Sequence, residues 1–478
     1  MADHLLFLTG KLAENSLRRV MQGLAPTPFT YEILNIGVSV AALMTADMIL
    51  RRLTDIRGAT KIMVPGLCTG DLGKVSAMLG VPVERGPVDL KDLPAYFGSG
   101  GKPRDLSRHD MQIFAEIVDA PQISVDEILR RAESYCSDGA DIIDIGCLPS
   151  TPFPHLEDAV RALRGAGHRV SVDSIEPDEL RRGGGAGADY LLSLKESTLA
   201  LTDEVESTPV LIPEQMGDMD SLYRAMDALE AKGRRYIVDS ILDPIHFGLT
   251  ASIVRYHALR ERYPDTEIMM GVGNLSELTD ADTSGINAVL LGIMSELRIT
   301  HLLTTQVSPH ARACVRELDH MRRILFAARE DGSLPRGYDA ALLAVHERKP
   351  FPYTTEEINE MAALVRDPSY RVQVTEAGIH VYNRDGLEVA GDPFALFSRL
   401  QLLKDDAPHA FYMGVELAKA QIAWQLGKRY TQDEELSWGC AVPPEKKAAP
   451  SDLHAYKPEG ETLKKRVKKS RVKKSTAK

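Results

Sequence analysis

The stretch Gly139-Ala-Asp-Ile-Ile-Asp-Ile-Gly-Cys-Leu-Pro-Ser-Thr-Pro152 decides the fold. It is a short apolar run that carries two acids and ends in a turn of small residues. A strand buried in a parallel sheet reads as such a continuous Ile/Val run. Asp144 lies late in the run, where a buried carboxylate is costly unless it has a partner. Barrel enzymes place ligand-binding groups at the carboxyl ends of strands, so we expect Asp144 in a site and Asp141 in a structural role.

The same pattern repeats along the middle of the chain. Seven further apolar runs of strand length occur, and segments with apolar residues at helical spacing lie between them. The other runs are 112–118, 168–173, 188–194, 208–213, 235–239, 267–273 and 300–306. The helical segments are 124–137, 157–165, 177–186, 221–232, 251–262, 286–297 and 309–329. This alternation predicts a parallel sheet, and eight units in about 200 residues fit a (β/α)8 barrel. An open doubly wound sheet is the alternative.

Composition bounds the class of protein. The 478 residues predict two to four domains, and the hydrophobic content of 44% supports full cores. No run of about 18 apolar residues occurs and the N-terminus lacks a basic region, so we expect neither a transmembrane helix nor a signal peptide. The five cysteines show no CxxC or CxxH spacing, which indicates neither a zinc site nor a disulfide framework. A reducing, cytoplasmic location is therefore expected.

The net charge of −11 is distributed unevenly along the chain. Lys464–Lys478 holds nine Lys or Arg and no acid, and subtracting these nine charges leaves −20 for the rest of the chain. A body this acidic is not expected to bind nucleic acid through its main surface. The basic tail is either a disordered solubilising segment, which we favour, or a segment that binds an anionic surface.

Changes of pattern divide the chain into four parts. These are an N-terminal α/β domain over 1–105, the barrel over 106–335, a small C-terminal α+β domain over 336–450 and a disordered basic tail over 451–478. In the first part, residues 40–53 predict one amphipathic helix, and the loop Pro65–Gly73 either cradles a phosphate or is a tight turn. The glycine-rich stretch Gly98–Pro103 predicts the linker to the barrel.

Three motifs occur in order along the barrel. Gly139–Gly146, Ser171-Val-Asp-Ser174 and Gly187-Ala-Asp189 are similar to the signatures of the second, third and fourth strands of the pterin-binding barrel family. That family includes dihydropteroate synthases and methyl-tetrahydrofolate methyltransferases. The resemblance covers about residues 110–330. It implies that Asp144 holds a pterin ring.

The flanking parts carry a second resemblance. His380–Gly386, His409–Gly414, Gln432-Asp433 and Trp438-Gly439 are similar to the C-terminal domain of dihydropteroate-synthase-related proteins in archaea and methylotrophic bacteria that use tetrahydromethanopterin. The resemblance implies a role in making or using a methanopterin-type one-carbon carrier. It also implies a small-molecule arylamine partner of the ribofuranosylaminobenzene phosphate type, and dimers are common in the family.

The chain departs from the synthase pattern at several places. Glu116 stands near the Asn that helps synthases to bind Mg²⁺ with pyrophosphate, and Ser193 stands near a second Asn. After the seventh strand, Gly273-Asn-Leu-Ser276 replaces a Ser-Arg-Lys-Ser run, and its Asn274 is closer to the methyltransferase branch. The acid of the sixth strand is either Asp239 or Asp243, and Asp239 fits the strand end better.

The flat edge of a pterin presents 2-amino and N3–H donors, and a buried carboxylate can accept both. A lone acid at a strand end more often caps a helix or pairs with a base, but several such acids on one barrel favour a binding site. The residues expected to bind the pterin are Asp144, Asp173, Ser193, Gln215, Asp239, Asp243 and Asn274, of which Asp173 and Asn274 are also the expected catalytic residues.

The functions that follow fall into three classes. The first is a dihydropteroate-synthase-like transferase with pterin as substrate, for which we expect Mg²⁺ at Glu116. Ser308, His310 and Arg312 follow the eighth strand, where barrels commonly bind phosphate, although His310 can also be a surface residue. The second is a pterin-dependent methyltransferase, and the third is a pterin-binding protein without turnover.

Overall fold

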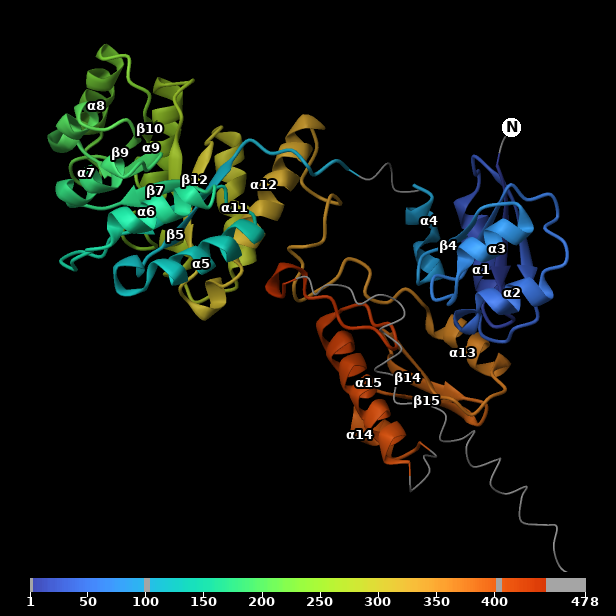
Figure 1. Cartoon of the computed structure of the whole chain (residues 1–478). Helices are drawn as coiled ribbons and strands as arrows, with labels where there is room; N and C mark the ends of the chain where they lie inside the picture. The colour runs from blue at the N-terminus through green and yellow to red at the C-terminus, as the bar shows by residue number, and fades with distance from the viewer. Residues whose placement is uncertain (1–2, 99–103, 401–405, 444–478) are drawn as a thin grey trace, which may run out of the picture. The chain divides into compact units, whose positions relative to one another are not determined.

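The computed structural model describes residues 3–98, 104–400 and 406–443, and it divides into two compact units (Figure 1). The barrel unit contains residues 104–343 and 439–443. The flanking unit contains the described residues 3–98, 344–400 and 406–438. The predicted linker falls almost entirely outside the described residues, and the predicted basic tail falls wholly outside them.

The barrel unit is a ring of eight parallel strands. They are β5 (Gln112–Ile117), β6 (Ile142–Gly146), β7 (Arg169–Asp173), β8 (Tyr190–Leu194), β9 (Thr208–Leu211), β10 (Ile237–Val238), β11 (Met269–Gly271) and β12 (His301–Thr305). They pair in the order β10-β9-β8-β7-β6-β5-β12-β11, and a parallel bridge between Val238 and Ile268 joins the two ends. The predicted (β/α)8 barrel is confirmed, because an open sheet would leave these ends unpaired.

Helices follow the strands as the periodicity predicts. They are α5 (Val125–Ser137), α6 (Leu156–Gly165), α7 (Pro177–Gly185), α8 (Met219–Ala231), α9 (Leu249–Arg262), α11 (Thr283–Glu296) and α12 (Cys314–Glu330). The connection after β8 is instead a 3-10 helix, η4 (Glu196–Asp203). Their apolar faces pack on the outside of the strands in one large cluster of buried side chains.

A second, smaller apolar cluster fills the interior of the ring. It includes Phe114 of β5 and Ile142 of β6, whereas Val170 and Val172 of β7 belong to the outer cluster. Side chains alternate between the two faces of a strand. The residues two positions after Phe114 and Ile142 therefore also face the interior, nearer the carboxyl ends of the strands. Those residues are Glu116 and Asp144, and on β7 the same face carries Ser171 and Asp173.

A buried arginine ties the last helix to the first two strands at the opposite end of the barrel. The Arg322 side chain of α12 is 2% exposed. It donates to the carbonyl oxygens of Met111 and Gly139, at 2.7 and 3.0 Å, and pairs with Asp141 and Asp319. Asp141 also accepts the Ile113 amide at 2.8 Å. Asp141 therefore has the structural role expected of an acid at the start of its strand.

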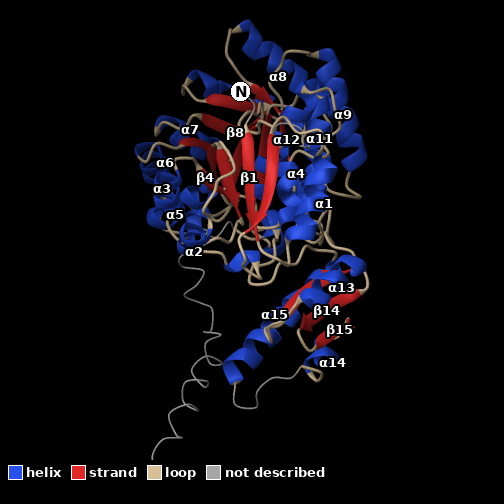
Figure 2. Ribbon diagram, turned by 90° about the vertical axis from the view of Figure 1, so that its right-hand side faces the viewer, coloured by secondary structure: helices blue, strands red, loops and turns tan. Residues whose placement is uncertain are grey.

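The flanking unit contains two sheets. The first is parallel, in the order β2-β1-β3-β4, with β1 (His4–Thr9), β2 (Thr30–Asn35), β3 (Lys61–Val64), β4 (Val83–Arg85) and the helices α1 (Glu14–Leu24), α2 (Ala46–Arg52), α3 (Leu72–Leu79) and α4 (Leu93–Tyr96). The second is antiparallel, with β13 (Arg371–Thr375), β14 (Gly378–Asn383) and β15 (Gly386–Ala390), and it packs against α15 (Ala407–Leu426) near α13 (Thr355–Leu364) and α14 (Pro393–Phe397) (Figure 2). The sequence predicts a small hairpin from Tyr370–Val374 and Ile379–Asn383, and the structure adds β15 as a third strand.

The single helix predicted over residues 40–53 is wrong. The structure has a short 3-10 helix, η1 (Ala41–Leu43), followed by α2, with a break at Met44-Thr45. The Thr45 backbone forms a parallel bridge with Thr69, and its side chain caps α2 by accepting the Met48 amide at 3.2 Å. A contact with a distant loop therefore overrides the helical periodicity. None of the described helices is long and apolar enough to cross a membrane.

Replacing Arg322 with alanine is expected to destabilise the barrel by about 3–5 kcal/mol, because Asp141 and two carbonyl oxygens lose a buried partner. Native-state hydrogen exchange of the β5 and β6 amides measures this loss of stability in the barrel unit separately from the flanking unit. Arg161→Ala on α6 is the matched control, because that arginine is 63% exposed, and it should change the free energy by less than about 0.5 kcal/mol. Equal effects of the two variants would contradict the structural role of Arg322.

Candidate functional site

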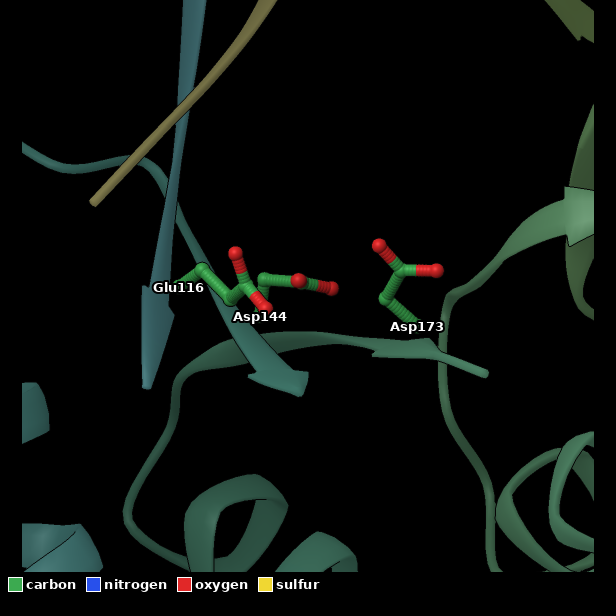
Figure 3. A group of neighbouring side chains, drawn as sticks. All are labelled: Glu116, Asp144 and Asp173. Atoms are coloured by element: carbon green, nitrogen blue, oxygen red, sulfur yellow. The ribbon is translucent and has the colours of Figure 1, made fainter. Parts of the chain in front are cut away.

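Three acids from neighbouring strands converge at the carboxyl end of the barrel. Glu116 of β5 and Asp144 of β6 are register partners, and Asp173 ends β7 beside Gly146. One carboxylate oxygen of each lies within 4.8 Å of those of the other two. Figure 3 shows Glu116 and Asp144 side by side, with the Asp173 carboxylate directed into the same space. The convergence follows from the inward alternation of β5, β6 and β7.

The electrostatic environment of the three acids disfavours their ionised forms. Burial and the charge of Asp173 raise the pKa of Glu116 to about 8. Burial, with the neighbouring charges of Asp173 and Glu116, also raises the pKa of Asp144 well above its usual range, and burial raises the pKa of Asp173. Among the described residues, no arginine or lysine forms an ion pair with any of the three. The cluster is therefore built to receive positive charge or hydrogen-bond donors.

Hydroxyl groups orient two of these acids and leave one oxygen of each open. The Ser171 hydroxyl donates to Asp144 Oδ1 at 2.5 Å, and the Ser193 hydroxyl donates to Asp173 Oδ1 at 2.7 Å. The second oxygen of Asp144 is buried and has no hydrogen-bond partner among the described residues. A buried acceptor without a partner costs free energy. Asp144 Oδ2 is therefore a prepared acceptor for a ligand.

Asp239 repeats this arrangement on the far side of the barrel, after β10. Its Oδ1 accepts the Tyr256 hydroxyl at 2.5 Å and the Ile241 amide at 2.7 Å. Burial raises the pKa of Asp239 to about 6, although these two hydrogen bonds oppose the shift, and the charge of Asp173 adds to it. Asp239 thus has one oxygen held by two hydrogen bonds, and the charge of Asp173 acts on it.

A glycine makes room for Glu116. A Cβ atom at Gly146 would lie 2.4 Å from Glu116 Oε1 and 3.0 Å from the Cα atom of Val118. The Glu116 carboxylate therefore rests over the end of β6, where any side chain would displace it. This explains why the apolar run of β6 ends in glycine.

The donor set suits a divalent cation such as Mg²⁺. Mg²⁺ prefers oxygen ligands, and Glu116, Asp144 and Asp173 each offer one within a small volume. A cation would also relieve the repulsion that raises the pKa of Glu116. The residues present therefore fit the metal expected at Glu116, and they add Asp144 and Asp173 to its candidate ligands.

Other predicted pterin-binding residues lie in different settings. Asp243 is buried in an ion pair with Arg255 at 2.6 Å, so its charge is already compensated. The Asn274 side chain donates to the Leu242 carbonyl at 2.7 Å, in the short helix α10 (Gly273–Ser276) that follows β11. Gln215 is exposed in the loop after β9. The structure thus gathers Asp144, Asp173, Ser193 and Asp239 more closely than these three.

One of the predicted phosphate-binding residues, Ser308, contacts a carboxylate. Glu277 accepts the amides of Val307 and Ser308 at 2.7 and 2.8 Å, and the Thr305 hydroxyl at 3.0 Å. The His310 ring lies 3.1 Å from the Ser276 carbonyl oxygen, and Arg312 is exposed. Glu277 therefore uses the backbone amides that a phosphate would need. Only the side chains of His310 and Arg312 then remain for the predicted contact with a phosphate.

Sequence reasoning missed three supporting residues. Ser171 lies two positions before Asp173 on one strand, so the alternation of β7 could have placed it on the inner face. Gly146 carried a signal as the small residue that ends the run. Tyr256 gave no signal in the sequence, because it lies 17 positions from Asp239 and only the packing of α9 brings the two residues together.

One protein family and several known proteins are similar to this chain or to parts of it. Residues 3–88 match a family of unknown function (DUF6513). An uncharacterized protein of Methanocaldococcus jannaschii is 25% identical, and the match covers 90% of this chain and 98% of the relative. A Burkholderia cenocepacia dihydropteroate synthase complexed with 7,8-dihydropteroate is 18% identical over 47% of this chain and 93% of its own, with a TM-score of 0.36. A Yersinia pestis dihydropteroate synthase is 16% identical over 47% and 96%, with a TM-score of 0.38.

Replacing Glu116 with glutamine should change how stability depends on pH. The folded-state pKa of Glu116, about 8, lies above the ordinary value of 4.5, so the native state binds this proton more tightly than the unfolded state. The stability of the parent protein therefore falls as pH rises from about 4.5 to 8. The variant should be more stable by about 1–3 kcal/mol at pH 8 and equally stable at pH 5.

Urea denaturation followed by circular dichroism, with EDTA present, measures this difference. Glu133→Gln is the control, because Glu133 is exposed on α5, and it should leave the pH dependence unchanged. An unaltered slope in Glu116→Gln would show that Glu116 is not held in this environment.

Proposed function

We propose that the barrel is a dihydropteroate-synthase-like transferase. It would join a dihydropterin methyl pyrophosphate to an arylamine of the ribofuranosylaminobenzene phosphate type, in tetrahydromethanopterin biosynthesis. The observation that carries the proposal is the set of inward-facing carboxylates at the barrel mouth, three of which, Asp144, Asp173 and Asp239, are each fixed through one oxygen by a hydroxyl group. The motifs of β6 and β7 support the choice of a pterin.

Asp144 is the proposed grip on the pterin edge. The ring presents adjacent N–H donors, and the unpartnered Asp144 Oδ2 is a buried acceptor at the carboxyl end of the barrel strands. Donors brought by the ligand would lower the raised pKa of Asp144 and favour its ionised form. Asp239 would accept a second contact, with Tyr256 holding its orientation. Ser193 would act through Asp173, whose hydrogen bond it supplies.

The reaction itself breaks the C–O bond between the pterin methylene and pyrophosphate and forms a C–N bond to the arylamine. The amine supplies its lone pair, pyrophosphate departs with the electrons of the C–O bond, and the proton of the new ammonium passes to water. Glu116 and Asp173 would hold a Mg²⁺ ion, which would supply charge neutralisation for pyrophosphate. His310 and Arg312 would contact the phosphate groups, while Asp173 and Asn274 would lie nearest the reacting carbon.

Pyrophosphate release tests the proposal directly. The full chain is incubated with the dihydropterin methyl pyrophosphate, the arylamine phosphate and Mg²⁺, and product is followed by chromatography. Asp144→Asn should lower kcat/KM by about 100-fold or more, because the amide presents a donor to the pterin donors. Asp158→Asn, exposed on α6, is the matched control and should retain activity. No pyrophosphate release from the parent protein would refute the synthase assignment.

Cation binding is tested without turnover. Millimolar Mg²⁺ should raise the melting temperature of the parent protein at pH 8, and it should raise that of Glu116→Gln by less than half as much, because a ligand and a negative charge are lost. An equal rise in both proteins would remove Glu116 from the proposed metal site.

One observation favours a second function, a pterin-dependent methyltransferase. Asn274 follows β11 where a synthase has basic residues, and an amide can hydrogen-bond the pterin near N5. Transfer of a methyl group from a methyl-tetrahydropterin to a corrinoid or thiol, without pyrophosphate chemistry, would select this function. Tight pterin binding with neither reaction would select a binding protein.

A further inference from the structure

The flanking unit contains a cleft of about 350 Å³ that is separate from the barrel site. It lies at the carboxyl ends of β1 and β3, lined by Thr9 at the end of β1, Leu12 after it, and Pro65 and Leu67 after β3. The volume falls in the range of small-molecule sites. The cleft is therefore large enough for a ligand of two or three fused rings.

The topology of the parallel sheet places the cleft where such sheets bind ligands. In the order β2-β1-β3-β4, the chain runs outward from β1 to β2 and then crosses back to β3 on the other side of β1. The loops after β1 and β3 thus leave the sheet in opposite directions and open a crevice between them. Ligands of open α/β sheets bind at such a switch point.

The opposite wall comes from the C-terminal part of the same unit. Tyr353 and the strand residues Arg371 and Gln373 line the cleft, together with Gln432. This wall is held by polar contacts at its edge, where the Tyr353 hydroxyl donates to Asp89 at 2.9 Å and Arg429 pairs with Asp89 at 2.7 Å. The cleft is therefore a walled site and not merely a groove on the sheet.

The charged side chains of the lining are already paired and offer no counter-charge to an occupant. Its two charged side chains are Asp89 and Arg371. Asp89 is paired with Arg429, and Arg371 donates to both carboxylate oxygens of Asp367 at 2.7 Å. The remaining lining is mostly aliphatic and aromatic, with Phe7 and Met63 among it. A charged ligand would be desolvated here without a counter-charge.

The uncapped start of α1 supplies hydrogen-bond donors at one side of the cleft. Ala13, at the N-cap, has no side chain to cap the helix, and both Ala13 and Ser16 line the cleft. The first turn of a helix carries backbone N–H groups without intrahelical partners. These groups and the Ser16 hydroxyl suit an acceptor such as a carbonyl oxygen.

We propose that this cleft binds a neutral, flat heteroaromatic molecule that carries a ring carbonyl oxygen, such as a fused-ring lactam. The rings would lie against the apolar walls, and the carbonyl oxygen would accept hydrogen bonds from the start of α1. This ligand site is independent of the reaction proposed for the barrel.

Quinazolin-4-one, a neutral two-ring lactam, is the probe, and its 2-carboxylate is the charged counterpart. Titration of the full chain, followed by ligand-observed NMR, should give saturable binding of quinazolin-4-one with a Kd below about 1 mM. The carboxylate should bind at least about tenfold more weakly. Absence of saturable binding, or equal binding of the two compounds, would overturn the proposal.

Ala42→Phe locates the site, because Ala42 lines the cleft and is only partly buried. The variant should weaken binding by about tenfold or more, and Leu12→Trp should do the same if Ala42→Phe fails to fold. Ala77→Phe, exposed on α3 outside the cleft, is the matched control and should bind like the parent. Binding that survives Ala42→Phe but is lost in Asp144→Asn would place the probe in the barrel and overturn the proposal.

Discussion

The burial of three carboxylates against one another is the constraint on which the barrel site depends. Glu116, Asp144 and Asp173 lie within reach of one ion, and no basic side chain of the described residues pairs with them. In a medium of low dielectric, like charges at this distance cannot all be ionised without compensation. Burial therefore raises the pKa of all three acids, and the site holds protons more tightly than isolated carboxylates do. Such strain persists only where the surrounding structure enforces it.

The barrel enforces it through regular features. Parallel pairing fixes Glu116 opposite Asp144, and strand alternation turns both inward above an apolar plug that includes Phe114. Gly146 leaves the space that the Glu116 carboxylate occupies. At the other end, Arg322 fastens the starts of β5 and β6 to the last helix of the barrel unit. The end of the barrel where the buried carboxylates cost free energy is thus supported by the contacts of Arg322 at the opposite end.

Much of the fold could be predicted from the sequence because a buried parallel strand has a continuous run of apolar residues. All eight barrel strands were predicted, as were the inward role of Asp144 and the structural role of Asp141. The helix predicted over residues 40–53 was wrong, since its break depends on the contact of Thr45 with Thr69, which no local pattern encodes. Asp239 was preferred over Asp243 from its place at the strand end, and the pairing of Asp243 with Arg255 supplies a physical reason for that preference.

The sequence by itself determined the alternation of strands and helices, the barrel that this alternation requires, and the acids at the strand ends. Each of these is a local property of spacing and polarity. Only the tertiary structure decided which acids share one space, that Asp144 Oδ2 is left without a hydrogen-bond partner among the described residues, and that Glu277 occupies the amides after β12. Tertiary structure likewise made the cleft of the flanking unit, whose walls lie some 300 residues apart in the chain and meet only through packing. Hydrogen bonds and charge interactions act through space, so their partners are fixed by the fold and not by the spacing along the chain.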